Sequence, residues 1–165
     1  MPEWDGYRIG PSVAVLNYTI RAAVPSDVAA LGDVFRRSSL SNDGDREALL
    51  ANPDALVFDD ASVHEQRTRV TVVDGRLVGF ATTRVVADFV ELDDLFVDPD
   101  WMRRGVGRAL IADVVTLARS WGASRVEVTA NGHALDFYET TGFIVDGVTD
   151  TRFGPGIRML LDVGT

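Results

Sequence analysis

The residues best suited to chemistry lie in one stretch, VDPDWMRRGVGRALI, which runs from Val97 to Ile111. Two glycines, Gly105 and Gly107, stand at the start of an amphipathic helical pattern. The first N–H groups of a helix have no intrahelical acceptor, its dipole adds partial positive charge, and glycines let a phosphate approach this backbone closely. The turn therefore predicts a site for a phosphorylated ligand. Three arginines add guanidinium groups to it: Arg103, Arg104 and Arg108.

Two other kinds of phosphate loop fit this turn badly. A Walker A loop needs a lysine before its serine or threonine, and the chain has none, because all 16 of its basic residues are arginine. A dinucleotide-binding fingerprint needs a third small residue at the place of Leu110. A tight strand-to-helix turn with surface arginines is the purely structural alternative.

The same stretch resembles the acyl-CoA-binding loop of the GCN5-related N-acetyltransferase (GNAT) family. That loop reads Gln/Arg-x-x-Gly-x-Gly/Ala and follows a strand that ends in Val-x-Pro. The strand end is matched by Val97-Asp98-Pro99, and the loop is matched by Gly105 and Gly107. Met102 stands where the family usually has Gln or Arg. This departure matters little to a loop that binds pyrophosphate through backbone N–H groups.

A second segment, NGHALDFYETTGF at residues 131–143, extends the resemblance. The family has an Asn here, an Ala three positions later, an aromatic pair and a Gly-Phe pair. The resemblance covers roughly residues 18–162. It implies an α+β, GNAT-like acyl-CoA N-acyltransferase fold, with a mixed central sheet of about six to seven strands flanked by about four helices. The matching residues of the second segment are Asn131, Ala134, Phe137, Tyr138, Gly142 and Phe143.

Hydrophobic periodicity and turn signals predict the elements that position these motifs. Asp74-Gly75 indicates a type I′ hairpin. Residues 1–17 are interpreted as an N-terminal extension and 18–165 as a single domain. Strands are predicted at 13–23, 69–73, 77–86, 91–97, 125–129, 143–148 and 157–162, and an irregular segment at 52–66. Helices are predicted after residue 25, at 45–51, at 133–140, and after the glycine loop with the stripe Val106, Leu110, Val114, Leu117 and Trp121.

The resemblance implies where the cosubstrate acetyl-CoA binds. In the family the two central parallel strands splay apart, and the pantetheine arm pairs with the backbone of the first, here Leu95, Phe96 and Val97. The pyrophosphate is expected on the N–H groups of residues 103–108. Asn131 is expected to bond the amide region of the cofactor, and its residue type equally predicts an N-cap for the helix that follows it.

Acetyl transfer also needs a neutral amine, and an amine of pKa near 10 is mostly protonated at pH 7. A carboxylate can take this proton, usually through water. Glu91 is the best positional match for the family's glutamate, Asp93 shares its strand face because alternate residues point the same way, and Glu127 is the third candidate. Asp94 is expected to point to the other face. The alternatives are a water chain without a dedicated base, and a solvated strand-edge role for each carboxylate.

Tyr138 occupies the family's position for the group that stabilises or protonates the departing thiolate. A packing role for its ring is the alternative. The chain has no cysteine to carry an acetyl group, and the resemblance implies direct transfer in a ternary complex. A non-catalytic acyl-CoA-binding or sensing domain is the alternative function.

Composition narrows the function classes further. The net charge of −9 disfavours nonspecific nucleic-acid binding, and no apolar run reaches the roughly 18 residues that span a membrane. The N-terminus lacks a signal-peptide core, and no metal-ligand spacing is present. We expect a cytoplasmic enzyme without metal that binds acetyl-CoA and an amine acceptor, either a small molecule or a protein N-terminus or lysine. A homodimer is compatible with these features. The segments at 36–66 and 146–157 are expected to select the acceptor.

Overall fold

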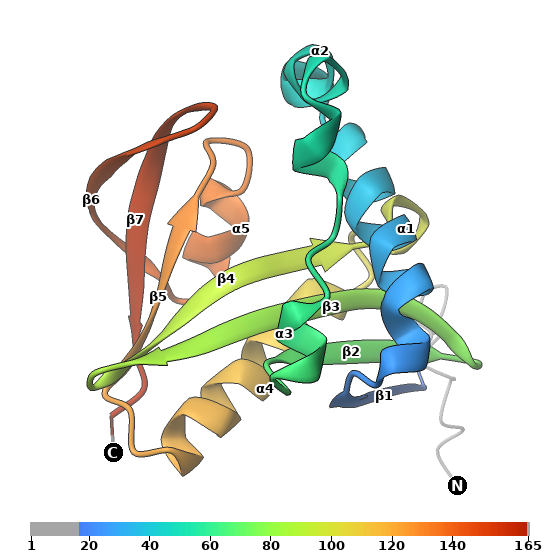
Figure 1. Cartoon of the computed structure of the whole chain (residues 1–165). Helices are drawn as coiled ribbons and strands as arrows, with labels where there is room; N and C mark the ends of the chain where they lie inside the picture. Colours follow the sequence, from blue (N-terminus) through green and yellow to red (C-terminus); the bar gives the residue numbers. More distant parts are fainter. Residues whose placement is uncertain (1–16, 165) are drawn as a thin grey trace, which may run out of the picture.

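A seven-stranded mixed sheet runs through the computed structural model, which describes residues 17–164 (Figure 1). Its strands are β1 (Tyr18–Ala22), β2 (Thr68–Val73), β3 (Arg76–Val86), β4 (Phe89–Val97), β5 (Arg125–Ala130), β6 (Ile144–Thr151) and β7 (Gly154–Asp162). The strand order is β1-β2-β3-β4-β5-β7-β6, and β4 and β5 are the parallel neighbours in it. The predicted mixed sheet of six to seven strands is confirmed.

Helices cover both faces of this sheet (Figure 1). They are α1 (Val28–Leu40), α2 (Asp43–Ala51), α3 (Ala61–His64), α4 (Val106–Ser120) and α5 (Leu135–Thr140), with 3₁₀ turns η1 (Pro25–Asp27), η2 (Pro53–Leu56) and η3 (Pro99–Trp101). α1 and α3 lie on one face of the sheet and α4 on the other. The helix beyond the predicted four is α3, a single turn inside the segment predicted to be irregular. No helix within residues 17–164 is long and apolar enough to cross a membrane.

Local sequence signals account for several boundaries. α2 begins where the Oδ1 of Asn42 accepts a hydrogen bond from the N–H of Gly44 at 3.1 Å. β2 and β3 are joined by Asp74 and Gly75, whose φ angles of 49° and 77° are those of a type I′ turn. The predicted hairpin is therefore confirmed. Residues 13–16 of the predicted first strand, and most of the predicted extension, lie outside the described residues.

Two apolar cores, one on each face, hold the sheet between its helices. On one face Leu31 and Val34 of α1 pack against Phe80 of β3. On the other, the stripe of α4 is buried as predicted at Val106, Leu110 and Val114, together with Ile111 and Ala118. The extension of this stripe to Trp121 is wrong. That residue is 49 % exposed, because the helix ends before it and the spacing no longer applies.

A β-bulge in β4 decides which of its side chains face α1. Asp94 pairs with Thr82 of β3, and Leu92 pairs with Thr83. Asp93 therefore has no paired residue in β3 and is the extra residue of the bulge. The bulge interrupts the strict alternation of a strand. Leu92 and Leu95, three positions apart, both pack in the α4 core. Asp94 therefore points to the same face as Glu91, and the prediction that it points to the opposite face is wrong.

The two parallel strands separate just beyond this bulge. β4 pairs with β5 over Phe89–Leu92 and Arg125–Val128, although both strands continue for at least two more residues. The last residues of β4 pair with β3 alone. The expected splay of the central strands is present, and it leaves one edge of β4 unpaired (Figure 1).

Candidate active site

The unpaired edge of β4 offers backbone groups for a ligand. The N–H of Asp98 donates to the C=O of Val78 at 2.8 Å, and alternate residues of an antiparallel strand turn their polar groups to the same neighbour. Phe96 is therefore bonded to β3, whereas Leu95 and Val97 turn their N–H and C=O toward the gap. Of the three residues expected to pair with pantetheine, the geometry suits these two. Phe96 contributes its ring to the aromatic core instead.

The glycine loop between β4 and α4 presents free backbone N–H groups. Arg103 and Gly105 both have positive φ, 61° and 85°, which turn the chain sharply just before the helix. The first intrahelical bond runs from the N–H of Ala109 to the C=O of Gly105 at 3.0 Å. The three residues between them therefore have N–H groups without an acceptor inside the helix. This is the arrangement that an anion site requires.

The two glycines of the loop have different structural roles. A Cβ on Gly105 would meet nothing within 4 Å, so the space over its backbone is open and its positive φ is what favours glycine. A Cβ on Gly107 would lie 3.0 Å from the Cζ of Phe137. Gly107 thus lets the first turn of α4 pack closely against α5. Gly105 gives the loop its turn before α4, and Gly107 sets the distance between α4 and α5.

The start of the loop is anchored by a buried carboxylate. Asp98 is only 3 % exposed. One of its oxygens accepts hydrogen bonds from Arg37 of α1 at 2.5 Å and from Arg76 of β3 at 3.3 Å. The other oxygen accepts the N–H of Asp100 at 2.9 Å. Because these partners come from a helix and a second strand, the loop is held in one position relative to both.

The arginines of the loop keep their charge available. The guanidinium of Arg104 lies over the ring of Trp101, 4.9 Å from its centre. Arg103 and Arg108 are exposed, and neither forms an ion pair within residues 17–164. All three can therefore reach a phosphate. Met102, the position that departs from the family pattern, is 39 % exposed beside them.

Asn131 combines a structural role with a free donor. Its Oδ1 accepts the N–H of Ala134 at 3.0 Å, so Asn131 stabilises the turn before α5. The N-cap of that helix is Ala134, and the prediction of Asn131 as the N-cap is wrong. The helix itself begins at Leu135, two residues later than predicted. No acceptor within residues 17–164 is bonded to the Nδ2 of Asn131. This amide group therefore remains able to donate to a ligand.

Tyr138 of α5 has a buried ring and an unpaired hydroxyl. It is 7 % exposed, and its ring packs edge-on against Phe137 at 5.2 Å and Phe143 at 5.3 Å. Within residues 17–164 its hydroxyl has no hydrogen-bond partner. Of the fully buried side-chain N and O atoms in this range, the Oγ1 of Thr71 alone lacks a partner, so the hydroxyl of Tyr138 is not fully buried. The tyrosine hydroxyl therefore reaches an accessible surface. Burial, and then the negative charge of Asp94, raise the pKa of Tyr138.

The carboxylates predicted as bases are bound to arginines. Glu91 accepts two hydrogen bonds from Arg158 of β7, at 2.6 and 3.0 Å, and Glu127 lies 3.5 Å from the same guanidinium. Asp93 accepts two hydrogen bonds from Arg84, at 2.7 and 2.9 Å. Both oxygens of Glu91 and both oxygens of Asp93 are therefore already bonded to a guanidinium group. The described residues contain no group of three His, Cys, Asp or Glu side chains that could hold a metal ion.

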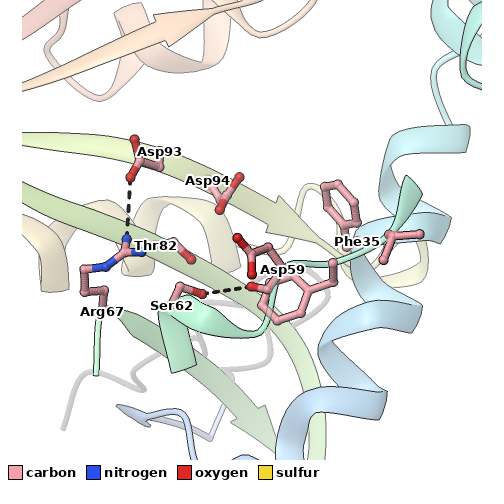
Figure 2. Close-up of a pocket in the computed structure, with 9 residues that line it drawn as sticks. Phe35, Asp59, Ser62, Arg67, Thr82, Asp93 and Asp94 are labelled. Carbon is pink, nitrogen blue, oxygen red and sulfur yellow. Dashed lines mark hydrogen bonds and ion pairs between the residues drawn. The ribbon is translucent and has the colours of Figure 1, made fainter. Parts of the chain in front are cut away.

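Asp94 lines a cavity, as Asp93 does, but unlike these three carboxylates it has no ion pair within residues 17–164 (Figure 2). The cavity has a volume of about 240 Å³, and α1, the segment before α3, β3 and β4 contribute its walls. Burial, and then the charge of Asp93, raise the pKa of Asp94 to about 6. A carboxyl group with this pKa is mostly ionised at pH 7 and accepts a proton readily. Sequence reasoning missed Asp94 because the β-bulge that turns it to this face depends on pairing with β3.

The chain is similar in sequence to known acetyltransferases. The acetyltransferase (GNAT) family model matches residues 34–143. A glucosamine 6-phosphate N-acetyltransferase from Trypanosoma brucei brucei is 31 % identical over 98 residues, which cover 50 % of this chain and 67 % of that protein. A ribosomal protein bS18-alanine N-acetyltransferase from Escherichia coli is 39 % identical over 72 residues, which cover 42 % of this chain and 49 % of that protein. The chain thus matches about half the length of the bacterial relative.

Solved structures share the fold at low sequence identity. A PaiA N-acetyltransferase from Thermoplasma acidophilum, in complex with coenzyme A, has a TM-score of 0.70 at 18 % identity, covering 88 % of this chain and 98 % of that chain. The ribosomal-protein-S18-alanine N-acetyltransferase from Escherichia coli has a TM-score of 0.68 at 23 % identity, covering 90 % and 95 %. At these identities the likeness shows the fold alone. With a family match over more than half of its length, the chain belongs to the GNAT family of acetyltransferases.

Proposed function

We propose that the protein is an acetyl-CoA-dependent N-acetyltransferase that moves the acetyl group directly to a primary amine in a ternary complex. The observation that carries this proposal is the proximity of two unpaired groups. Asp94 faces a pocket, and Tyr138 has a free hydroxyl near enough for the charge of Asp94 to raise its pKa. The first can accept a proton from an amine, and the second can donate a hydrogen bond to a sulfur atom.

The cofactor side of the site suits an acyl-CoA. The free edge at Leu95 and Val97 offers donors and acceptors to the amides of pantetheine. The open backbone at residues 103–108, with its arginines, suits a pyrophosphate. The Nδ2 of Asn131 suits a carbonyl oxygen. When bound, acetyl-CoA supplies an activated acetyl group, and these residues hold it beside Asp94 and Tyr138.

Asp94 takes the proton of the acceptor amine, directly or through one water molecule. The C–S bond of the thioester breaks, the C–N bond of the amide forms, and the proton leaves the nitrogen for the carboxylate of Asp94. This assignment replaces Glu91 and Asp93 as the base. Their guanidinium partners, Arg158 and Arg84, already bond both oxygens of each carboxylate.

Tyr138 donates a hydrogen bond to the departing sulfur. A thiol has a reference pKa of about 8.5, and the pKa of Tyr138 lies above that of a free tyrosine. Complete proton transfer from Tyr138 to the thiolate is therefore uphill. A hydrogen bond that strengthens as charge develops on sulfur is the role that fits, and the proton reaches the thiolate from Asp94 or water.

A sensing domain would need neither an unpaired base nor an acid beside the thioester, so the pair of Asp94 and Tyr138 argues for turnover. We further propose that residues 18–165 form the catalytic domain after an extension at 1–17, and that the protein acts in the cytoplasm. A homodimer remains a prediction from the sequence.

The proposal is tested by incubating the full chain with acetyl-CoA and a panel of primary amines. Released CoA and the acetylated amine are measured by thiol titration and mass spectrometry. We expect amide product and intersecting lines in initial-rate plots. Tight acetyl-CoA binding without transfer to any amine would favour the sensing domain. Parallel lines, or acetylated protein formed without acceptor, would contradict direct transfer.

A further inference from the structure

The cavity beside Asp94 carries more negative charge than its own residues neutralise. Its walls hold the carboxylates of Asp59, Asp93 and Asp94 and a single guanidinium, that of Arg67. Arg67 is already shared, because its side chain lies 2.6 Å from Glu65 and 3.6 Å from Asp93. Like charges in a confined space repel one another, and a bound cation relieves this repulsion.

Asp59, like Asp94, is a carboxylate of this cavity that has no ion-pair partner within residues 17–164. Its Oδ1 accepts the N–H of Ala61 at 3.0 Å, but within residues 17–164 no cationic side chain lies at ion-pair distance from it. Asp59 comes from the segment before α3 and lies beside Asp94 of β4 (Figure 2). The charge of Asp59 is one of the influences on the pKa of Asp94.

The remaining wall of the cavity is apolar. Phe35 of α1 and Phe58 lie edge to face with their ring centres 6.3 Å apart. Val57 is 73 % exposed at the rim of the same cavity. These side chains suit a short hydrocarbon segment, and the ring faces also attract a cation. Tyr138 is not a wall residue of this cavity, and it lies near enough to Asp94 for that charge to raise its pKa.

We propose that the acceptor is a small aliphatic amine with a second cationic group, such as a diamine or polyamine. This inference rests on the proposed N-acetyltransferase function. Asp94 takes the proton of the reacting amine, Asp59 binds the second ammonium group, and the hydrocarbon between them lies against Phe35 and Phe58. The C–N bond forms as the C–S bond breaks, and the second ammonium group keeps its proton throughout.

The same charge distribution disfavours anionic acceptors. An amino acid would bring its carboxylate next to Asp59, and a sugar phosphate would bring two negative charges into a pocket that already has an excess of them. The relative that acts on glucosamine 6-phosphate therefore does not predict the acceptor of this chain.

Three acceptors with four carbon atoms each test the inference: 1,4-diaminobutane, butylamine and 4-aminobutanoate. Beyond the reacting amine, the first has an ammonium group, the second has no further polar group, and the third has a carboxylate. With saturating acetyl-CoA, we expect kcat/KM to be highest for the diamine, at least about tenfold lower for butylamine, and lowest for 4-aminobutanoate, since one charge-assisted hydrogen bond accounts for about a tenfold change. Calorimetry of 1,4-diaminobutane with the CoA-loaded enzyme gives a second readout that does not depend on turnover.

Asp59→Asn removes the charge of this side chain and keeps the acceptor oxygen that bonds Ala61. We expect kcat/KM for the diamine to fall about tenfold relative to the value for butylamine, so that the preference for the diamine is lost. Asp60→Asn is the matched control, because Asp60 is an adjacent exposed aspartate outside the cavity. This control variant should retain the full preference for the diamine.

The outcomes separate the two proposals. If amines are acetylated without preference for the diamine, or if 4-aminobutanoate is preferred, the acceptor inference is overturned and N-acetyltransfer stands. An enzyme that binds acetyl-CoA and acetylates amines of another class, but neither binds nor acetylates 1,4-diaminobutane, overturns the inference in the same way. If acetyl-CoA is neither bound nor used, the proposed function itself falls.

Discussion

The proposed cofactor side and the proposed acceptor side of the site are built by different means. On the cofactor side, consecutive residues from Leu95 to Arg108 present backbone groups, and two glycines give the chain its shape. On the acceptor side, the pocket is formed by side chains from α1, the segment before α3, β3 and β4. Backbone recognition constrains a short stretch of sequence and leaves a motif. A pocket formed by side chains from distant segments leaves no sequence motif. Its residues, and with them the acceptor, can therefore change while cofactor binding is kept.

The largest expected effect separates Asp94 from the paired carboxylates of the acceptor side. Asp94→Asn should lower kcat about 10³-fold, within the range of a positioned general base, with acetyl-CoA affinity nearly unchanged. Glu91→Gln should lower it less than about tenfold, because Glu91 is already bound to Arg158. Both variants are measured with saturating acetyl-CoA after thermal unfolding confirms a folded protein. A larger loss for Glu91→Gln would return the role of base to Glu91.

A smaller rate effect is expected at the boundary between the two sides. Tyr138→Phe keeps the ring that packs against Phe137 and Phe143 and removes the hydroxyl. We expect kcat to fall about 10²-fold, the lower end of the range for acid catalysis, because the raised pKa limits the tyrosine to hydrogen bonding. Single-turnover rates measure this directly. An unchanged rate for the chemical step would assign Tyr138 to packing alone.

The parent protein should also be less stable at neutral pH than a variant with an uncharged side chain at position 94. The pKa of Asp94 is raised from 3.8 to about 6, so the folded state favours its protonated form. This contribution to stability is complete below about pH 4 and is lost as pH rises through about 6. Asp94→Asn should therefore be more stable than the parent by up to about 3 kcal/mol at pH 7.5. The difference should vanish near pH 4. Urea unfolding at both pH values measures it, and a variant less stable at pH 7.5 would contradict the prediction.

The cofactor side is tested by two glycines with the same backbone conformation. Gly105 and Gly122 have φ of 85° and 75°, and a Cβ on either would meet nothing within 4 Å. Valine at each position should cost about 1–2 kcal/mol of stability through the same strain. Gly105→Val alone should raise the Kd of acetyl-CoA, by about tenfold, because its side chain covers the anion site. Calorimetry compares the two, and equal affinities would remove Gly105 from the site.

Short-range features of the sequence predicted several local elements well. The type I′ turn at Asp74-Gly75 and the helix after the glycine loop depend on residues close together in the chain. The order of elements followed from hydrophobic periodicity and turn signals, and the splay of the central strands followed from the family resemblance. Errors remained at boundaries such as Trp121, where a helical period was continued past the end of the helix.

The acceptor side was decided by contacts between segments distant in the sequence. The alternation rule placed Asp94 on the wrong face because the bulge arises from pairing with β3. The sequence of β4 alone does not predict this bulge. Glu91 and Asp93 have the residue type of a base, but Arg158 and Arg84 reach them from other strands. The sequence by itself determined the GNAT fold through its resemblance to that family, and it determined a glycine turn at the start of a helix because such a turn depends on local geometry. The tertiary structure alone decided which carboxylate remains unpaired, because ionisation and burial depend on neighbours that only the folded chain brings together.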